Sequence, residues 1–287
     1  MRMGDKDGMT LNDQQPTAQT VEAYPPQALA VVETLRAQFP EAGVSLGPAT
    51  SDFRVAAAFW AEGSPDMEAG LAYQDRFATD MTDRIRAAHL IAFYSNQLSM
   101  VLGAFYLGAG LTAEVAGLRF EDWTRTSRGV AVAGKRYHFR FDRLVPGEDI
   151  AGFERKFRAH LKPVIAVLKR RTGLSSGAQW RLAADALAGA FLEIGRAVGD
   201  EARGMAAALA IVKRQGSPLY SDALCYEEIT ALDPASDERL SRYYRMRCGC
   251  CLYFRTEGGS FCDTCVLLEP GARRARLVAH LMQNGGA

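Results

Sequence analysis

Cysteine is the residue type whose placement in this sequence points most directly to chemistry. The chain of 287 residues has six cysteines, and five of them lie within 18 residues near the C-terminal end: Cys248, Cys250, Cys251, Cys262 and Cys265. A disulfide framework would distribute its cysteines through the fold that it stabilises. The local cluster therefore indicates metal binding or redox chemistry.

The spacing of these cysteines leaves two sets of four ligands open. Cys262 and Cys265 form a C-x2-C pair, a usual way to bring two thiolates to one metal. The opposing pair is either Cys248 and Cys251, which is also C-x2-C and suits zinc, or the adjacent Cys250 and Cys251. Adjacent side chains leave an extended backbone in opposite directions, so they suit a two-iron cluster better than one small ion. From spacing alone, an iron–sulfur cluster, a zinc ion and a redox dithiol all stay open.

The segment Cys-Cys-Leu-Tyr-Phe-Arg, followed after a spacer of ten residues by Cys-x-x-Cys, resembles the C-terminal signature of the FhuF-like siderophore-iron reductases. That signature reads close to C-C-L-Y-Y-R, a glycine-rich spacer, and C-x-x-C-P-L. Phe254 and Val266 replace the Tyr and Pro that are common there, and Cys248 is an additional thiol beside the motif. Gly258-Gly259 matches the spacer, and the four ligand positions of the family fall on Cys250, Cys251, Cys262 and Cys265.

This resemblance implies an oxidoreductase with a [2Fe–2S] cluster. It would reduce siderophore-bound Fe(III) to Fe(II) by one electron and release the iron in the cytoplasm. The partners expected are a ferric siderophore, with the hydroxamate type as one candidate, and an external electron donor such as a ferredoxin or a reductase. No nicotinamide or flavin motif is legible, no catalytic residue is assigned beyond the cluster, and no nucleic-acid partner is expected.

Two other functions remain as alternatives. The first is a zinc-ribbon module that binds nucleic acid or an acidic protein through a basic stretch of the chain. The second is an iron–sulfur redox sensor in which Cys248 acts as a resolving thiol. The colour of the anaerobically purified protein separates a cluster from zinc.

An arginine-rich stretch leads into the cysteines. Residues 239–255 hold five arginines and no Asp or Glu. Arg247 and Arg255 flank the cysteine pair, where a guanidinium would favour the reduced, more negative cluster and raise its potential. Tyr253 is expected to shield the cluster from water. The other three arginines, spaced at i, i+3 and i+6, are expected on a solvated helix face: Arg239, Arg242 and Arg245.

Composition places the chain among ordinary globular proteins. Hydrophobic residues make up 48% of the sequence and charged residues 23%, and the net charge is +1. A basic surface over the whole protein, as nucleic-acid binding favours, is therefore excluded. Cys225 stands apart from the cluster and is expected to be a buried apolar residue on a short helix. The four histidines lie more than ten residues from any cysteine, so no mixed Cys/His site is expected.

Hydrophobic periodicity predicts a mainly α (α+β) fold: a helical body with a small β-hairpin or sheet insertion and a C-terminal cysteine-rich [2Fe–2S] segment. The predicted parts are a disordered leader at 1–24, a body at 25–235 with its β-insertion near 114–145, and the cluster-binding segment at 236–287. Within the insertion, Gly134-Lys135 is expected to turn the hairpin. Short helices are expected at 220–230 and 237–245.

One stretch is long enough to span a membrane. Residues 87–113 contain no Asp, Glu, Lys or Arg. Because His, Ser, Asn and Gln interrupt it, a buried core helix is expected, and a peripheral contact with the inner membrane stays open. The N-terminal residues have no apolar run of signal-peptide type, so a cytoplasmic location is expected.

Overall fold

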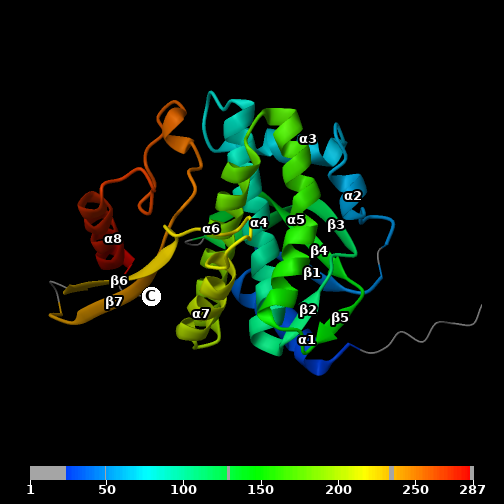
Figure 1. Ribbon diagram of the computed structural model, residues 1–287, viewed down its shortest axis with the longest axis horizontal. Coiled ribbons are helices and arrows are strands. Elements are labelled where there is room, and N and C mark those ends of the chain that lie inside the picture. The colour runs from blue at the N-terminus through cyan, green and yellow to red at the C-terminus, as the bar shows by residue number, and fades with distance from the viewer. Residues whose placement is uncertain (1–23, 49, 128–129, 233–235, 285–287) are drawn as a thin grey trace, which may run out of the picture.

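Two groups of secondary-structure elements surround one long helix in the computed structural model, which describes residues 24–48, 50–127, 130–232 and 236–284 (Figure 1). The predicted leader lies outside the described residues, Tyr24 excepted. The predicted mainly α fold is confirmed. The helices of the body are α1 (Pro26–Gln38), α2 (Ala56–Phe59), α3 (Pro65–Ala72), η1 (Tyr73–Arg76), α4 (Asp83–Ala109), α5 (Ile150–Thr172), α6 (Ser176–Ala197) and α7 (Glu201–Val212).

Helix α4 forms the centre of the body. The Thr82 side chain caps its first turn by accepting a hydrogen bond from the backbone N–H of Ile85, and Gly110 ends it in the left-handed conformation with φ 66°. Among the described helices it alone is long and apolar enough to cross a membrane, but 78% of its most apolar window is buried inside the protein. It is therefore a core helix, as expected, and it packs along α6.

A three-stranded sheet covers one side of α4. Its strand order is β1 (Gly43–Leu46), β4 (Val130–Phe141), β3 (Gly117–Ser127); β1 is parallel to β4, and β3 is antiparallel. A separate ladder joins β2 (Leu111–Ala113) to β5 (Leu144–Pro146). Tyr137, Phe139 and Phe141 alternate along β4 and are buried against the core. This alternation gives the sheet one apolar face.

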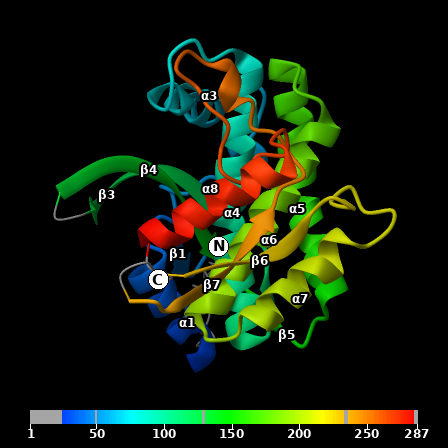
Figure 2. The same cartoon turned by 90° about the vertical axis from the view of Figure 1, so that its left-hand side faces the viewer.

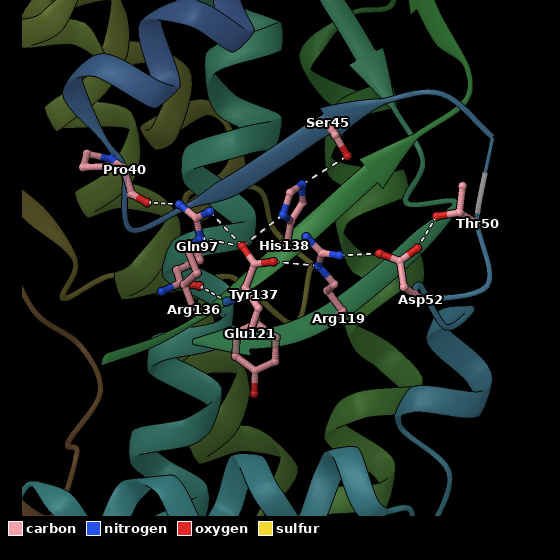
Figure 3. A network of polar contacts seen from close by, with 10 residues as sticks. All are labelled: Pro40, Ser45, Thr50, Asp52, Gln97, Arg119, Glu121, Arg136, Tyr137 and His138. Atoms are coloured by element: carbon pink, nitrogen blue, oxygen red, sulfur yellow. Dashed lines mark hydrogen bonds and ion pairs between the residues drawn. The ribbon is translucent and has the colours of Figure 1, made fainter. Parts of the chain in front are cut away.

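The opposite face of the sheet carries an ion-pair network (Figure 3). Glu121 accepts hydrogen bonds from Arg119 at 2.6 Å and from Arg136 at 2.8 Å, and His138 Nδ1 lies 3.1 Å from the same carboxylate. Burial alone would raise the pKa of Glu121, but Arg136 and His138 outweigh it, so the net pKa is lowered. This network holds His138 on the outer face of the sheet, away from the cysteines.

The predicted turn at Gly134-Lys135 is wrong. Ser127 pairs with Val130, and the ladder continues through Trp123 and Gly134, so β4 runs on through Gly134 without a turn. A Cβ at position 134 would lie 3.2 Å from the Trp123 Nε1 and 3.3 Å from the Tyr73 hydroxyl. The glycine therefore leaves room for two aromatic side chains within a strand, and the sequence gives no sign of that packing.

The C-terminal part of the chain forms a smaller unit beside α6, on the side away from the three-stranded sheet (Figure 1). Strands β6 (Cys225–Leu232) and β7 (Arg239–Met246) form an antiparallel hairpin, and α8 (Pro270–Asn284) packs across it. Their shared apolar core consists of Ile229, Met246, Leu277 and Leu281. Strand β6 precedes the predicted boundary at 235/236, yet it pairs with β7 beyond that boundary.

The helices predicted at 220–230 and 237–245 are therefore wrong. Both segments are short, and short runs of apolar residues fit a helix or a strand about equally well. Leu240, Tyr244 and Met246 alternate along β7 and pack with α8 in the smaller core. Pairing between the two strands and burial against α8 decide the conformation, and neither contact is visible from local periodicity. Cys225, expected to be buried on a helix, is exposed at the start of β6.

The body is expected to lose stability in acid, because a buried histidine becomes protonated there. Burial lowers the pKa of His160 to about 4, and its Nε2 hydrogen-bonds the buried Tyr94 hydroxyl. The unfolded chain binds a proton near pH 6.5, whereas the folded chain does not until about pH 4. The free energy of unfolding is therefore expected to fall as the pH drops from 6.5 toward 4, by up to ~1.4 kcal/mol per pH unit. Denaturant titrations should show a shallower fall in His160→Gln; equal slopes for the variant and the wild type would contradict this assignment.

Candidate metal centre

The cysteine segment is a loop between β7 and α8 that lies against the body. It runs from Cys248 past the short helix η2 (Tyr253–Arg255) to Cys265. The middle of the loop contacts the segment that precedes α4: the Thr79 hydroxyl donates a hydrogen bond to the Glu257 carboxylate at 3.0 Å. Figure 2 shows the same loop extending from the hairpin toward the end of the body that carries α3.

A buried carboxylate on α6 fixes the start of this loop. Asp185 accepts hydrogen bonds from the backbone N–H of Cys248 at 2.8 Å and of Gly249 at 2.9 Å. The same carboxylate pairs with the Arg247 Nε at 3.3 Å, and the Asp185 side chain is 3% exposed. A Cβ on Gly249 would lie 3.0 Å from the Leu182 backbone nitrogen, so the absence of a side chain lets the loop approach the helix closely.

Arg247 connects this anchor to the thiols. Its Nη1 donates to the Cys262 Sγ at 3.3 Å and lies 4.0 Å from the Cys251 Sγ. The Arg247 side chain is 12% exposed. One guanidinium thus contacts Asp185 on one side and two cysteines on the other. The geometry brings a buried positive charge to the place where thiolates would gather.

The four cysteines of the predicted ligand set lie close enough to interact with one another. The interaction between the Cys251 and Cys262 thiols lowers the pKa of Cys251 and raises that of Cys262. Burial raises the pKa of Cys250, whose Sγ accepts the Leu252 N–H at 3.4 Å. Cys265 contributes to the raised pKa values of both Cys250 and Cys262. Its backbone N–H donates a hydrogen bond to the Cys262 carbonyl at 2.9 Å.

In number and type this donor set fits a [2Fe–2S] centre, which takes four cysteine thiolates. Across the described ranges, no three Cys, His, Asp or Glu side chains were found grouped so as to hold one metal ion.

Cys248 lies in a different environment from the other four. It is buried in the main apolar core, and its Sγ faces the Arg181 carbonyl at 3.5 Å. Burial, together with the nearby Asp185 carboxylate, raises the pKa of Cys248 to about 12. The pKa values of Cys250 and Cys262 are raised as well, so it is the position of Cys248 in the core, and not its pKa, that sets it apart. The structure thus separates Cys248 from the two pairs, a distinction that spacing left open.

His89 is the neighbour of the site that the sequence did not reveal. It lies on α4, far from the cysteines in sequence, yet its imidazole is near enough to the Cys251 thiol to lower the pKa of that thiol. Its ring centroid is 5.8 Å from that of Tyr253. Tyr253 therefore packs between the loop and the body, beside Cys251. The distance in sequence concealed this contact, and no local pattern could have found it.

Two backbone features shape the loop after the cysteine pair. Leu252 adopts the left-handed conformation with φ 63°, which is costly for a side chain of this size and reverses the chain after Cys251. Gly259 then closes the loop, because a Cβ there would lie 2.1 Å from the Tyr253 carbonyl oxygen. Of the Gly258-Gly259 pair singled out in the sequence, Gly259 is required for this close approach, and Gly258 adopts the left-handed conformation with φ 69°.

The arginines before the cysteines do not form a solvated helix face. Arg239 is exposed, but Arg242 lies 3.8 Å from the Glu193 carboxylate of α6, and Arg245 donates to the Asp185 carbonyl. That expectation was wrong because the segment is the strand β7, whose edge faces α6. Arg255 is exposed and lies over the Phe254 ring at 5.6 Å. Of the two arginines expected near the cluster, Arg247 contacts the thiols.

Comparison with known proteins identifies this loop. Residues 247–267 match the family model described as the FhuF 2Fe-2S C-terminal domain. The match covers the cysteine segment, with Arg247 at its start, and it implies a [2Fe–2S] cluster as cofactor. No curated protein and no solved structure matches the chain.

Proposed function

We propose that this chain is a ferric-siderophore reductase, in which siderophore-bound Fe(III) accepts one electron and leaves as Fe(II). The observation that carries the proposal is the match of residues 247–267 to the FhuF 2Fe-2S C-terminal domain. We assign the ligands of the cluster to Cys250, Cys251, Cys262 and Cys265. The contact of Arg247 with two of these thiols supports the assignment.

When bound, a [2Fe–2S] cluster supplies a one-electron carrier. The residues of the chain determine how that carrier is held and tuned. Arg247 donates a hydrogen bond to sulfur and brings a positive charge, and both favour a more negative reduced state. Asp185 holds that guanidinium in place and fixes the backbone beside it. Tyr253 and His89 cover the Cys251 side of the loop.

The chemistry of the substrate explains why one electron suffices for release. Siderophores bind Fe(III) through hard oxygen donors, and Fe(II) is a softer, less charged ion that these donors hold less tightly. A separate donor, such as a ferredoxin or a reductase, would supply the electron. We propose the cytoplasm as the location of the reaction, because the released iron would pass to cellular ligands there, and peripheral contact with the inner membrane is part of the same proposal.

The proposed reaction is tested with the anaerobic, dithionite-reduced protein freed of excess reductant. Mixing it with ferric siderophores of the hydroxamate, catecholate and carboxylate classes should restore the absorbance of the oxidised cluster. An Fe(II)-specific chelator should trap one Fe(II) for each cluster reoxidised. Gallium(III) complexes of the same siderophores are the control, because Ga(III) accepts no electron here. Failure to reoxidise with every class would contradict a reductase and favour a redox sensor.

Loss of Arg247 is expected to lower the reduction potential. Arg247→Leu removes an N–H···S hydrogen bond and a nearby positive charge, both of which favour the reduced cluster. The expected decrease is on the order of 60 mV, which equals ~1.4 kcal/mol for one electron. Potentiometric titration followed by EPR measures it. Arg255→Leu is the matched control, because Arg255 is exposed and contacts Phe254; equal shifts in both variants would contradict a specific role for Arg247.

A further inference from the structure

One ring nitrogen on the central helix is buried close to the cysteine loop without a hydrogen-bond partner. It is the Nε2 of His89, on α4, for which the described ranges of the chain provide no partner. Buried polar groups in folded proteins are almost always hydrogen-bonded, because an unmade bond leaves the cost of removing the group from water uncompensated. The orphaned nitrogen therefore indicates a partner that the protein acquires in another state.

Two aromatic rings hold the His89 imidazole in place. The ring centroid of Tyr253, in the cysteine loop, lies 5.8 Å from that of His89. The ring centroid of Phe77, in the segment before α4, lies 6.4 Å from it. Because α4 is the core helix of the body, packing fixes the imidazole between the body and the loop.

Cys251 is the thiol that this imidazole influences. Cys251 precedes Tyr253 by two residues in the loop, and His89 is near enough to lower the pKa of its thiol. The Arg247 Nη1 lies 4.0 Å from the same sulfur. One nitrogen-bearing side chain from the loop and one from the body are thus both close to Cys251.

Metal coordination changes what the Cys251 sulfur can accept. A free thiol keeps its own proton and is a weak acceptor, whereas a coordinated thiolate has lost that proton and carries negative charge. Hydrogen bonds to an ionised acceptor are stronger than those between neutral groups. An imidazole carries at least one ring N–H in either protonation state. Cluster binding would therefore supply the acceptor that the buried ring nitrogen of His89 lacks.

We propose that His89 donates a ring N–H hydrogen bond to the coordinated Cys251 sulfur and thereby raises the reduction potential of the cluster. Hydrogen bonds to cluster sulfurs favour the reduced, more negative state. The inference rests on the proposed assignment of Cys251 as a ligand and does not depend on the substrate. Since α4 carries the donor, the potential depends on how the loop is seated on the body.

Potentiometric titration at one fixed pH tests this effect. His89→Phe keeps a ring between Tyr253 and Phe77 but has no N–H. Its equilibrium constant for reduction should fall by roughly five- to tenfold, and tenfold equals ~59 mV for one electron. His89→Gln has no ring but keeps an N–H donor, so it should recover most of the lost potential. An unchanged potential in His89→Phe, or equal losses in both variants, would overturn the proposal.

His280→Phe is the matched control for these titrations. His280 lies on α8, is exposed, and hydrogen-bonds the Tyr244 hydroxyl through its Nδ1 at 3.1 Å. Its replacement should leave the reduction potential unchanged. A decrease equal to that in His89→Phe would overturn the specific role of His89.

Pulsed EPR of the reduced protein detects the hydrogen bond itself. The unpaired electron of a reduced cluster couples weakly to nitrogen nuclei that donate hydrogen bonds to its sulfurs. Protein labelled with ¹⁵N only in histidine should show this coupling, which should persist in His280→Phe and vanish in His89→Phe. If His89→Phe assembles no cluster, the other two proteins decide: coupling in both supports the proposal, and no ¹⁵N coupling in the wild type overturns it.

These measurements separate the inference from the proposed function, because neither uses a siderophore. A lowered potential in His89→Phe, in a protein that no ferric siderophore reoxidises, would support the role of His89 and contradict the reductase. Reoxidation by ferric siderophores, with an unchanged potential in His89→Phe, would support the reductase and contradict the role of His89. An unaltered cluster in Cys251→Ser would contradict Cys251 as a ligand, and the role of His89 with it.

Discussion

Replacing either cysteine of the C-x2-C pair by serine is expected to abolish the cluster. Cys262 and Cys265 are the pair common to both ligand sets that the spacing allows, and Cys262 contacts both Cys251 and Arg247. A serine hydroxyl is a far weaker soft-metal ligand than a thiolate. The Cys262→Ser and Cys265→Ser proteins should be colourless as purified, with iron and acid-labile sulfide near zero.

Cys248→Ser is the matched control, and it should retain the cluster. The Cys248 thiol is buried in the apolar core, where its Sγ faces the Arg181 carbonyl. A modest loss of stability is expected from placing a hydroxyl there. A colourless Cys248→Ser protein together with a coloured Cys250→Ser protein would contradict the proposed ligand set and favour Cys248 with Cys251 as the first pair.

Replacing Asp185 is expected to release the whole loop. The carboxylate holds two backbone N–H groups and one guanidinium, and it is nearly inaccessible to water. Its removal in Asp185→Ala leaves Arg247 buried without its anion, at a cost of about 3–5 kcal/mol. For a chain of this size, that corresponds to a decrease in Tm of roughly 10 °C. Thermal unfolding followed by circular dichroism measures it.

The cluster should be lost together with this anchor. Arg247 and the backbone at Cys248 and Gly249 set the position of the cysteine pair, so Asp185→Ala is also expected to lower iron content per chain. Asp122→Ala is the control, because Asp122 pairs with Lys135 at 2.7 Å but its side chain is 85% exposed. An exposed pair contributes ~1 kcal/mol or less. A similar Tm and iron content in both variants would show that Asp185 does not anchor the loop.

The chemistry of the site was predictable from sequence because it is local. Four thiols, their spacing and the glycine pair all lie within one short segment, and the segment match to residues 247–267 rests on that same information. The long amphipathic helices were predictable for a similar reason, since a period repeated over several turns is a strong signal. The buried β4 residues Tyr137, Phe139 and Phe141 alternate as a half-buried strand should.

Contacts between distant segments were not predictable. Asp185 carries no motif, and it becomes the anchor of the loop because α6 brings it beneath Cys248. His89 was set aside because no cysteine is near it in sequence, yet it lowers the pKa of the Cys251 thiol. The hairpin of β6 and β7 was taken for helices because its strands are stabilised by each other and by α8.

The central claim is that the cysteine loop holds a [2Fe–2S] cluster that carries one electron. Visible absorption and EPR spectra of the anaerobically purified protein, recorded before and after reduction, test it most directly. We predict a red-brown, EPR-silent protein with two irons and two sulfides per chain, which bleaches with dithionite and then gives the EPR signal of one unpaired electron. A colourless protein with one stoichiometric zinc and no iron would contradict the claim and identify a zinc module instead.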